Sequence, residues 1–194
     1  SSYSANATPW YQYGQAIKHI NIEEGVTKLA LNSFYNAGAS ANYPNVRTLS
    51  IPSTLGAPIE TNFFYGCPLK TVTINSDTIV GKASYSSNSS LQTKFGAQVE
   101  EYIIGGGVRS IANFAFYNQS ADSLCSIYLP EGLEAIGNWA FGYIDHLTSV
   151  TVPSTVQTIG TDAFAGCSKL HSVELGEGLK TVNGQAFWMC DNLT

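Results

Sequence analysis

One pattern of apolar residues recurs at a nearly constant interval along this chain, and such repetition constrains the fold before any local feature does. Segments 124–146, 147–169 and 170–192 align with one another without a gap, each 23 residues long. The same opening position recurs upstream, so seven units tile residues 17–192 and an eighth begins near the last residue. The units open at Ile17, Val46, Leu69, Val99, Leu124, Leu147, Leu170 and Leu193.

Each unit starts with a short alternation of apolar and polar residues. When the opening residue is position zero, position three is aliphatic or tyrosine and position five is aliphatic. This period of two predicts a β-strand whose alternate side chains face opposite sides. A turn containing Gly or Pro follows, for example PST, GGG or PEG, and a second apolar pair after it indicates a second short strand.

An Ala-Phe dipeptide comes next in most units, and Phe34 holds the phenylalanine position in the first unit. A unit this small cannot bury its aliphatic residues and a phenylalanine alone, so neighbouring units must stack around a shared core. The sequence therefore predicts an α/β-type repeat solenoid with a seven-stranded parallel sheet on one side, roughly 30 Å wide at about 4.8 Å per strand. The other side is expected to hold the second short strands, short helical or 3-10 turns, and a file of phenylalanines that includes Phe116, Phe141, Phe164 and Phe187.

The third unit departs from this pattern. It is 30 residues long, lacks phenylalanine at the expected position and contains the polar stretch 84–90. A degenerate repeat is the favoured interpretation, and a hinge or a recognition loop is the alternative. Phe95, just before the fourth unit, is expected to fill the place of the missing aromatic side chain.

The repeated residues carry a family resemblance. The stretch LTSVTVPSTVQTIGTDAFAGC at 147–167 resembles the BspA-like branch of the leucine-rich repeats, and TPWYQYGQAIKHINIEEGV at 8–26 resembles the segment that precedes the first repeat in many such proteins. The resemblance implies an N-terminal capping segment at 1–16 and a leucine-rich repeat solenoid at 17–194. It also implies a secreted or cell-surface protein with a role in adhesion and protein binding.

Charge and hydropathy exclude several partners. Nine Lys and Arg against fourteen Asp and Glu give a net charge of −5 without any basic cluster, so no nucleic acid partner is expected. No apolar run reaches the length of a membrane span, and no membrane insertion is expected. The chain starts without methionine or a signal-peptide pattern, which suggests a mature product or a piece of a longer protein. The oligomeric state stays open.

The cysteines do not follow a zinc-binding pattern. Cys67, Cys167 and Cys190 each lie three residues after a repeat phenylalanine. Because Cys167 and Cys190 are one repeat apart, a disulfide between them is conceivable, but buried thiols are the favoured interpretation. Cys125 is also expected to be a packed thiol.

Other candidates for chemistry have simpler explanations. His146 and His171 could approach one another, yet solvated surface histidines are favoured over a metal site because a third ligand is not evident. The recurring corner glutamates, such as Glu131, fit turn chemistry better than a glycosidase pair. No catalytic, cofactor-binding or metal-ligating residue is therefore predicted, and no cofactor.

The exposed face of the sheet remains as the candidate ligand-binding face. Positions two and four of each strand should point away from the core, and they are rich in serine and threonine. Tyr128 and Ile103 form a small apolar island there, and an exposed tyrosine suits protein recognition. The candidate residues are Thr73, Glu101, Ile103, Ser126, Tyr128, Ser149, Thr151, Ser172 and Glu174.

These observations favour a non-enzymatic interaction or adhesion module, extracellular or at the cell surface, with a protein or glycan ligand. The regular units and the absence of a poised acid, base or nucleophile motivate this hypothesis. A structural spacer within a larger surface protein is the alternative. A carbohydrate-active enzyme is a remote alternative, since it would need clustered carboxylates or basic residues on one face.

Overall fold

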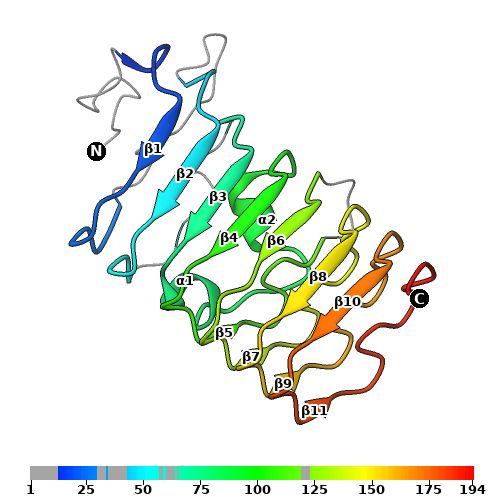
Figure 1. The fold of residues 1–194 in the computed structure, drawn as a ribbon. Helices are drawn as coiled ribbons and strands as arrows, with labels where there is room; N and C mark the ends of the chain where they lie inside the picture. Colours follow the sequence, from blue (N-terminus) through cyan, green and yellow to red (C-terminus); the bar gives the residue numbers. More distant parts are fainter. Residues whose placement is uncertain are drawn as a thin grey trace.

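The chain winds into a solenoid whose coils repeat with the sequence units (Figure 1). The computed structural model describes residues 13–29, 34, 43–56, 59, 64, 66–118 and 123–194. Residues 1–12 of the expected capping segment lie outside this description. The first strand of each coil runs parallel to the next along one side: β1 (His19–Asn21), β2 (Thr48–Ile51), β3 (Thr71–Ile74), β4 (Glu101–Ile104), β6 (Ser126–Tyr128), β8 (Ser149–Val152) and β10 (Ser172–Leu175).

A second set of short strands follows a separate side of the solenoid (Figure 1). They form one parallel sheet in the order β11-β9-β7-β5, with one strand from each of the four units that open at Val99, Leu124, Leu147 and Leu170. Their bounds are β5 (Ser110–Ile111), β7 (Ala135–Ile136), β9 (Thr158–Ile159) and β11 (Thr181–Val182). The predicted fold class is confirmed.

The strand register places equivalent repeat positions side by side. Leu49 pairs with Val72, and Val72 pairs with Tyr102, so position three stacks through the sheet. The central strands alternate between partly exposed and buried side chains, with positions three and five in the core. In the last coil Leu175 is 48% exposed, because a described neighbour covers this coil on one side only.

A file of aromatic rings runs through the stack. Neighbouring rings lie nearly parallel, with centroids 5.4 Å apart for Phe34 and Phe64, 5.2 Å for Phe116 and Phe141, 5.0 Å for Phe141 and Phe164, and 5.3 Å for Phe164 and Phe187. Such ring pairs contribute about 0.5–1.5 kcal/mol beyond the area they bury. The predicted file of phenylalanines is confirmed.

Phe95 fills the gap that the third unit leaves in the file, as predicted. Its centroid lies 5.7 Å from Phe64 and 6.2 Å from Tyr102, and Tyr102 in turn lies 4.9 Å from Phe116. Phe95 reaches this position at the end of helix α2 (Leu91–Phe95). The aromatic file is therefore continuous across the irregular unit.

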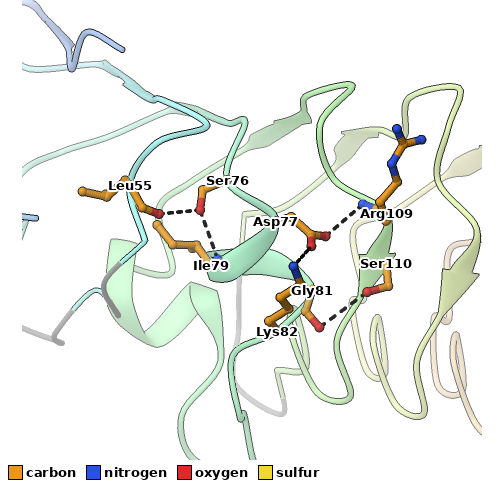
Figure 2. Close-up of polar contacts among 8 residues, drawn as sticks. All are labelled: Leu55, Ser76, Asp77, Ile79, Gly81, Lys82, Arg109 and Ser110. Atoms are coloured by element: carbon orange, nitrogen blue, oxygen red, sulfur yellow. Dashed lines mark hydrogen bonds and ion pairs between the residues drawn. The ribbon is translucent and has the colours of Figure 1, made fainter. Parts of the chain in front are cut away.

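The extra residues of the third unit fold into short helices. Helix α1 (Asp77–Val80) begins after Ser76, whose buried hydroxyl accepts a hydrogen bond from the Ile79 amide at 3.3 Å and donates one to the Leu55 carbonyl at 2.6 Å (Figure 2). The helix is thereby fixed to the preceding coil. Of the helices in the described ranges, none has the length and hydrophobicity of a membrane span.

Asp77 fixes the same unit to the following coil. Its carboxylate accepts a hydrogen bond from the Arg109 amide at 2.9 Å and pairs with Lys82 at 3.0 Å (Figure 2). Burial alone would raise the pKa of Asp77, but these bonds together hold its pKa below the ordinary value. Anchoring on both sides favours a degenerate repeat over a hinge.

The expectation of one seven-stranded parallel sheet is wrong. The strands form a five-stranded sheet, β1-β2-β3-β4-β6, and a separate pair, β8 and β10, because no ladder joins β6 to β8. The Asn75 and Gly105 amides, at position six, donate to the Ile51 and Ile74 carbonyls and extend two of the intact junctions. At the β6–β8 junction this bond is missing as well, because Pro153 occupies position six after β8 and proline has no amide hydrogen to donate.

We expect Phe141→Ala to lower the free energy of unfolding by about 3–5 kcal/mol, because Phe141 is fully buried between two stacked rings. Urea denaturation followed by circular dichroism measures the change. Trp188→Ala, at a side chain 47% exposed, is the control and should cost less than about 1 kcal/mol. A cost below 1 kcal/mol for Phe141→Ala would contradict the shared aromatic core.

We expect Asp77→Asn to cost about 1 kcal/mol of stability at neutral pH. Since the pKa of folded Asp77 is depressed, the charge stabilises the fold fully above the unfolded pKa of about 3.9 and loses its effect as the pH falls through the folded pKa. Urea denaturation between pH 2 and 7 should thus show the two proteins converging in acid. The exposed Asp191→Asn is the control; a difference for Asp77→Asn that stays constant down to pH 2 argues against this role.

Candidate interaction surface

The nine predicted surface residues lie on one face of the first strands. None of them is buried: Ser126, Tyr128, Ser149, Thr151 and Glu174 are exposed, and the others are partly exposed. The register aligns them in two rows across the strands, with Glu101 beside Ser126, Ile103 beside Tyr128, Ser149 beside Ser172 and Thr151 beside Glu174. The predicted apolar island of Ile103 and Tyr128 is therefore present.

A groove of about 530 Å³ opens on this face where the ladder between β6 and β8 is missing. We call it the β6–β8 groove. Five of the nine predicted residues line it: Glu101, Ser126, Tyr128, Ser149 and Thr151. Thr73, Ile103, Ser172 and Glu174 lie on the same face outside the groove lining.

The groove exists because adjacent backbones are not bonded there. At the neighbouring junctions the first bonds run from Cys125 N to Glu100 O (3.0 Å) and from His171 N to Thr148 O (3.0 Å). Among the described residues no backbone bond reaches the equivalent Cys125 carbonyl. Ile127 is consequently only partly buried, although position three is fully buried in β2, β3 and β4.

Two carboxylates give the groove a negative character. Glu101 accepts a hydrogen bond from the Thr71 hydroxyl at 3.3 Å. Glu131 accepts one from the Ser154 hydroxyl at 3.0 Å, which links its corner to the next coil. Glu24 makes the same contact with Ser53, whose amide and hydroxyl lower the pKa of that carboxylate, so the turn interpretation of these glutamates holds.

The sequence interpretation missed Cys125 as a surface residue. Cys125 is exposed and lines the β6–β8 groove, with its Sγ atom 3.5 Å from the Glu100 carbonyl. The expectation of a packed thiol is wrong, because position one faces solvent at the edge of the missing ladder. The sequence contains a signal for this exposure, because position one is polar or charged in the other six units: Lys18, Arg47, Lys70, Glu100, Thr148 and His171.

The other cysteines and histidines considered as reactive or metal-binding residues do not line the β6–β8 groove. All four cysteines are thiols, and Cys67, Cys167 and Cys190 are buried, as favoured. Burial raises the pKa of Cys67 to about 12. His146 and His171 are exposed, and no group of three potential metal ligands occurs in the described parts of the chain.

Comparison with known sequences identifies the repeat. The sequence model of the BspA type leucine rich repeat region, in six copies, matches residues 9–101 and 94–194. No curated protein matches the chain.

Solved structures with the same architecture come from several bacteria. A leucine-rich repeat protein from Bacteroides ovatus superposes with a TM-score of 0.61 at 23% identity, over 92% of this chain and 45% of that protein. A leucine rich cell surface protein from Faecalibacterium prausnitzii gives 0.51 at 22% identity, over 89% and 39%. The Leucine Rich Repeat protein of T. pallidum gives 0.50 at 19% identity, over 86% and 91%. This chain thus spans less than half of the first two proteins, and at these identities the similarity establishes the fold alone.

We expect a thiol reagent to modify one of the four cysteines of the native protein. Cys125 is exposed, whereas the other three thiols are buried and the raised pKa of Cys67 keeps it protonated at pH 8. Titration with Ellman's reagent should therefore count one thiol in buffer and four in denaturant. Cys125→Ser should reduce the native count to zero, and reaction of a second native thiol would be inconsistent with the described core.

Proposed function

The chain belongs to the BspA type leucine rich repeat family, and on this premise we propose that it is a non-enzymatic interaction module that binds a protein partner at the cell surface or outside the cell. Leucine-rich repeat proteins typically mediate protein interactions. Because one structural neighbour is a leucine rich cell surface protein, that similarity supports the proposed location.

The β6–β8 groove is the observation that carries the proposal. It places Tyr128, 58% exposed, among hydroxyl groups and carboxylates on an otherwise regular face. Tyrosine supplies a rigid contact surface at low entropic cost, and serine and threonine provide adaptable hydrogen bonds. A groove of about 530 Å³ falls within the size range of ligand sites.

The chemistry of the described residues supports binding rather than catalysis. A nucleophile needs an adjacent base to be activated, and the exposed Cys125 thiol has no histidine in the groove lining. The hydroxyl groups of Ser126 and Ser149 likewise have no histidine beside them there. These features support a surface that binds a partner without catalysing a reaction.

We expect partners to bind the sheet face, and bulky substitutions on it to block them. Purified extracellular proteins arrayed at micromolar concentration provide candidate partners, and biolayer interferometry measures their affinity. The double variant Thr73→Trp with Ser172→Trp flanks the groove without lining it and should weaken binding at least tenfold. The matched double variant Thr158→Trp with Thr181→Trp, on the second sheet, should change binding less than twofold. An array without any binder, or equal loss from both variants, would refute the proposal.

A further inference from the structure

The lining of the β6–β8 groove contains acidic side chains and no basic one, and the nearby Arg109 guanidinium donates to the Gly132 carbonyl at 3.2 Å. Glu101 and Glu131 line it, and the described lining residues include no lysine or arginine. The ion pairs in the described ranges, Lys70 with Glu100 and Lys82 with Asp77, involve neither carboxylate. A carboxylate offers about four acceptor sites, and the one hydrogen bond described for Glu101, from Thr71, leaves capacity for a ligand.

An aromatic residue lies diagonally across the sheet from one of these carboxylates. Glu101 pairs with Ser126, and Tyr128 lies two residues farther along β6 on the same face. Adjacent strands about 4.8 Å apart with a rise of about 3.3 Å per residue put the Cα atoms of Glu101 and Tyr128 roughly 8 Å apart. A cation over a tyrosine ring is attracted within about 6 Å of the centroid, so one cation can reach both groups.

We propose that the β6–β8 groove binds an arginine-bearing segment of the partner protein, with the guanidinium group between the Tyr128 ring and the Glu101 carboxylate. This inference rests on the proposed function and specifies the chemistry of its partner. Guanidinium pairs with carboxylate through two parallel hydrogen bonds and stacks on aromatic faces, whereas an ammonium group does neither as well. The hydroxyl groups of Ser126 and Ser149 line the groove and can bind the flanking backbone of the segment, and the Thr151 hydroxyl, which donates to Glu174 at 3.1 Å, can still accept a hydrogen bond.

Charge favours this occupant over a neutral glycan. Two carboxylates in a groove create a potential that draws a cation and speeds its association. A neutral saccharide gains nothing from that potential and must displace water from the carboxylates, which costs free energy. A protein segment is therefore the occupant that the groove fits better.

The test uses capped pentapeptides in which two arginines alternate with threonines, and matched peptides with citrulline or lysine replacing arginine. Isothermal titration calorimetry measures affinity, and slower alkylation of Cys125 by a maleimide reports occupation of the groove. We expect citrulline to weaken binding at least tenfold and lysine about threefold. Raising sodium chloride from 50 to 300 mM should also weaken binding, because salt screens exposed charges.

Variants separate the two contacts. Glu101→Gln and Tyr128→Ala should each weaken binding of the arginine peptide at least fivefold, while the exposed controls Glu177→Gln and Tyr13→Ala change it less than twofold. Circular dichroism of each variant verifies the fold, and the citrulline comparison on the unmodified protein does not depend on any variant. Tyr13 is a matched control, since it is 60% exposed against 58% for Tyr128.

Several outcomes would overturn the inference: no binding of the arginine peptide, equal binding of the citrulline peptide, or insensitivity to both groove variants. Protection of Cys125 by neutral oligosaccharides but not by the arginine peptide would assign the groove to glycans instead. Suppose that Thr73→Trp with Ser172→Trp abolishes binding of a protein partner, while Glu101→Gln and Tyr128→Ala do not change it. That result would support the proposed binding face and refute only the arginine site.

Discussion

Stacking of each coil on the next is the interaction on which every other feature of this molecule depends. The coils are joined by backbone bonds in both directions: on the strand side Lys70 N donates to Arg47 O of the preceding coil (2.7 Å), and on the aromatic side Phe141 N donates to Ala163 O of the following coil (2.7 Å). Between these two sets the aromatic rings and aliphatic side chains form one core. A single coil can neither pair its backbone hydrogen-bonding groups nor bury its apolar side chains. The stack of coils, rather than the single coil, is therefore the stable structure.

The buried cysteines belong to this stacking system. Cys67, Cys167 and Cys190 each donate an Sγ hydrogen bond to the carbonyl of the phenylalanine in the preceding coil, at 3.3, 3.1 and 3.2 Å. A protonated thiol is required for that bond, and burial raises the pKa of Cys67 to about 12 and that of Cys190 above its ordinary value, which keeps them protonated. Each thiol faces a carbonyl group rather than the next thiol, so the one-repeat spacing of Cys167 and Cys190 does not produce a disulfide.

The repeating periods are enough to predict the solenoid, its core positions and its exposed face, because each of these follows from burial that recurs with the sequence. They do not predict the backbone of the aromatic side, where Phe114, Trp139 and Asp162 adopt positive φ although they share no side-chain type. That conformation recurs where the backbone bonds to the next coil, as from Trp139 N to Thr161 O (3.0 Å). It is therefore determined by stacking of the coils and not by the type of side chain. The groove escapes prediction for a similar reason, since it forms between two units of identical length.

Proline weakens several junctions of the first-strand side, but it does not account for the groove alone. Pro153, at position six after β8, removes the amide that would donate across the β6–β8 junction, whereas Pro130 affects the β4–β6 junction, because position-six amides such as Gly105 N donate to the preceding coil. The same loss, through Pro52 at β1–β2 and Pro130 at β4–β6, shortens those ladders to three residues without ending them, so a missing proline donor does not by itself open the groove. On the opposite side the rings of Phe141 and Phe164 remain 5.0 Å apart, so the two coils separate at the sheet while their aromatic side stays packed. The recess thus lies within a regular repeat, without an inserted loop, at the place where the ladder between β6 and β8 is absent.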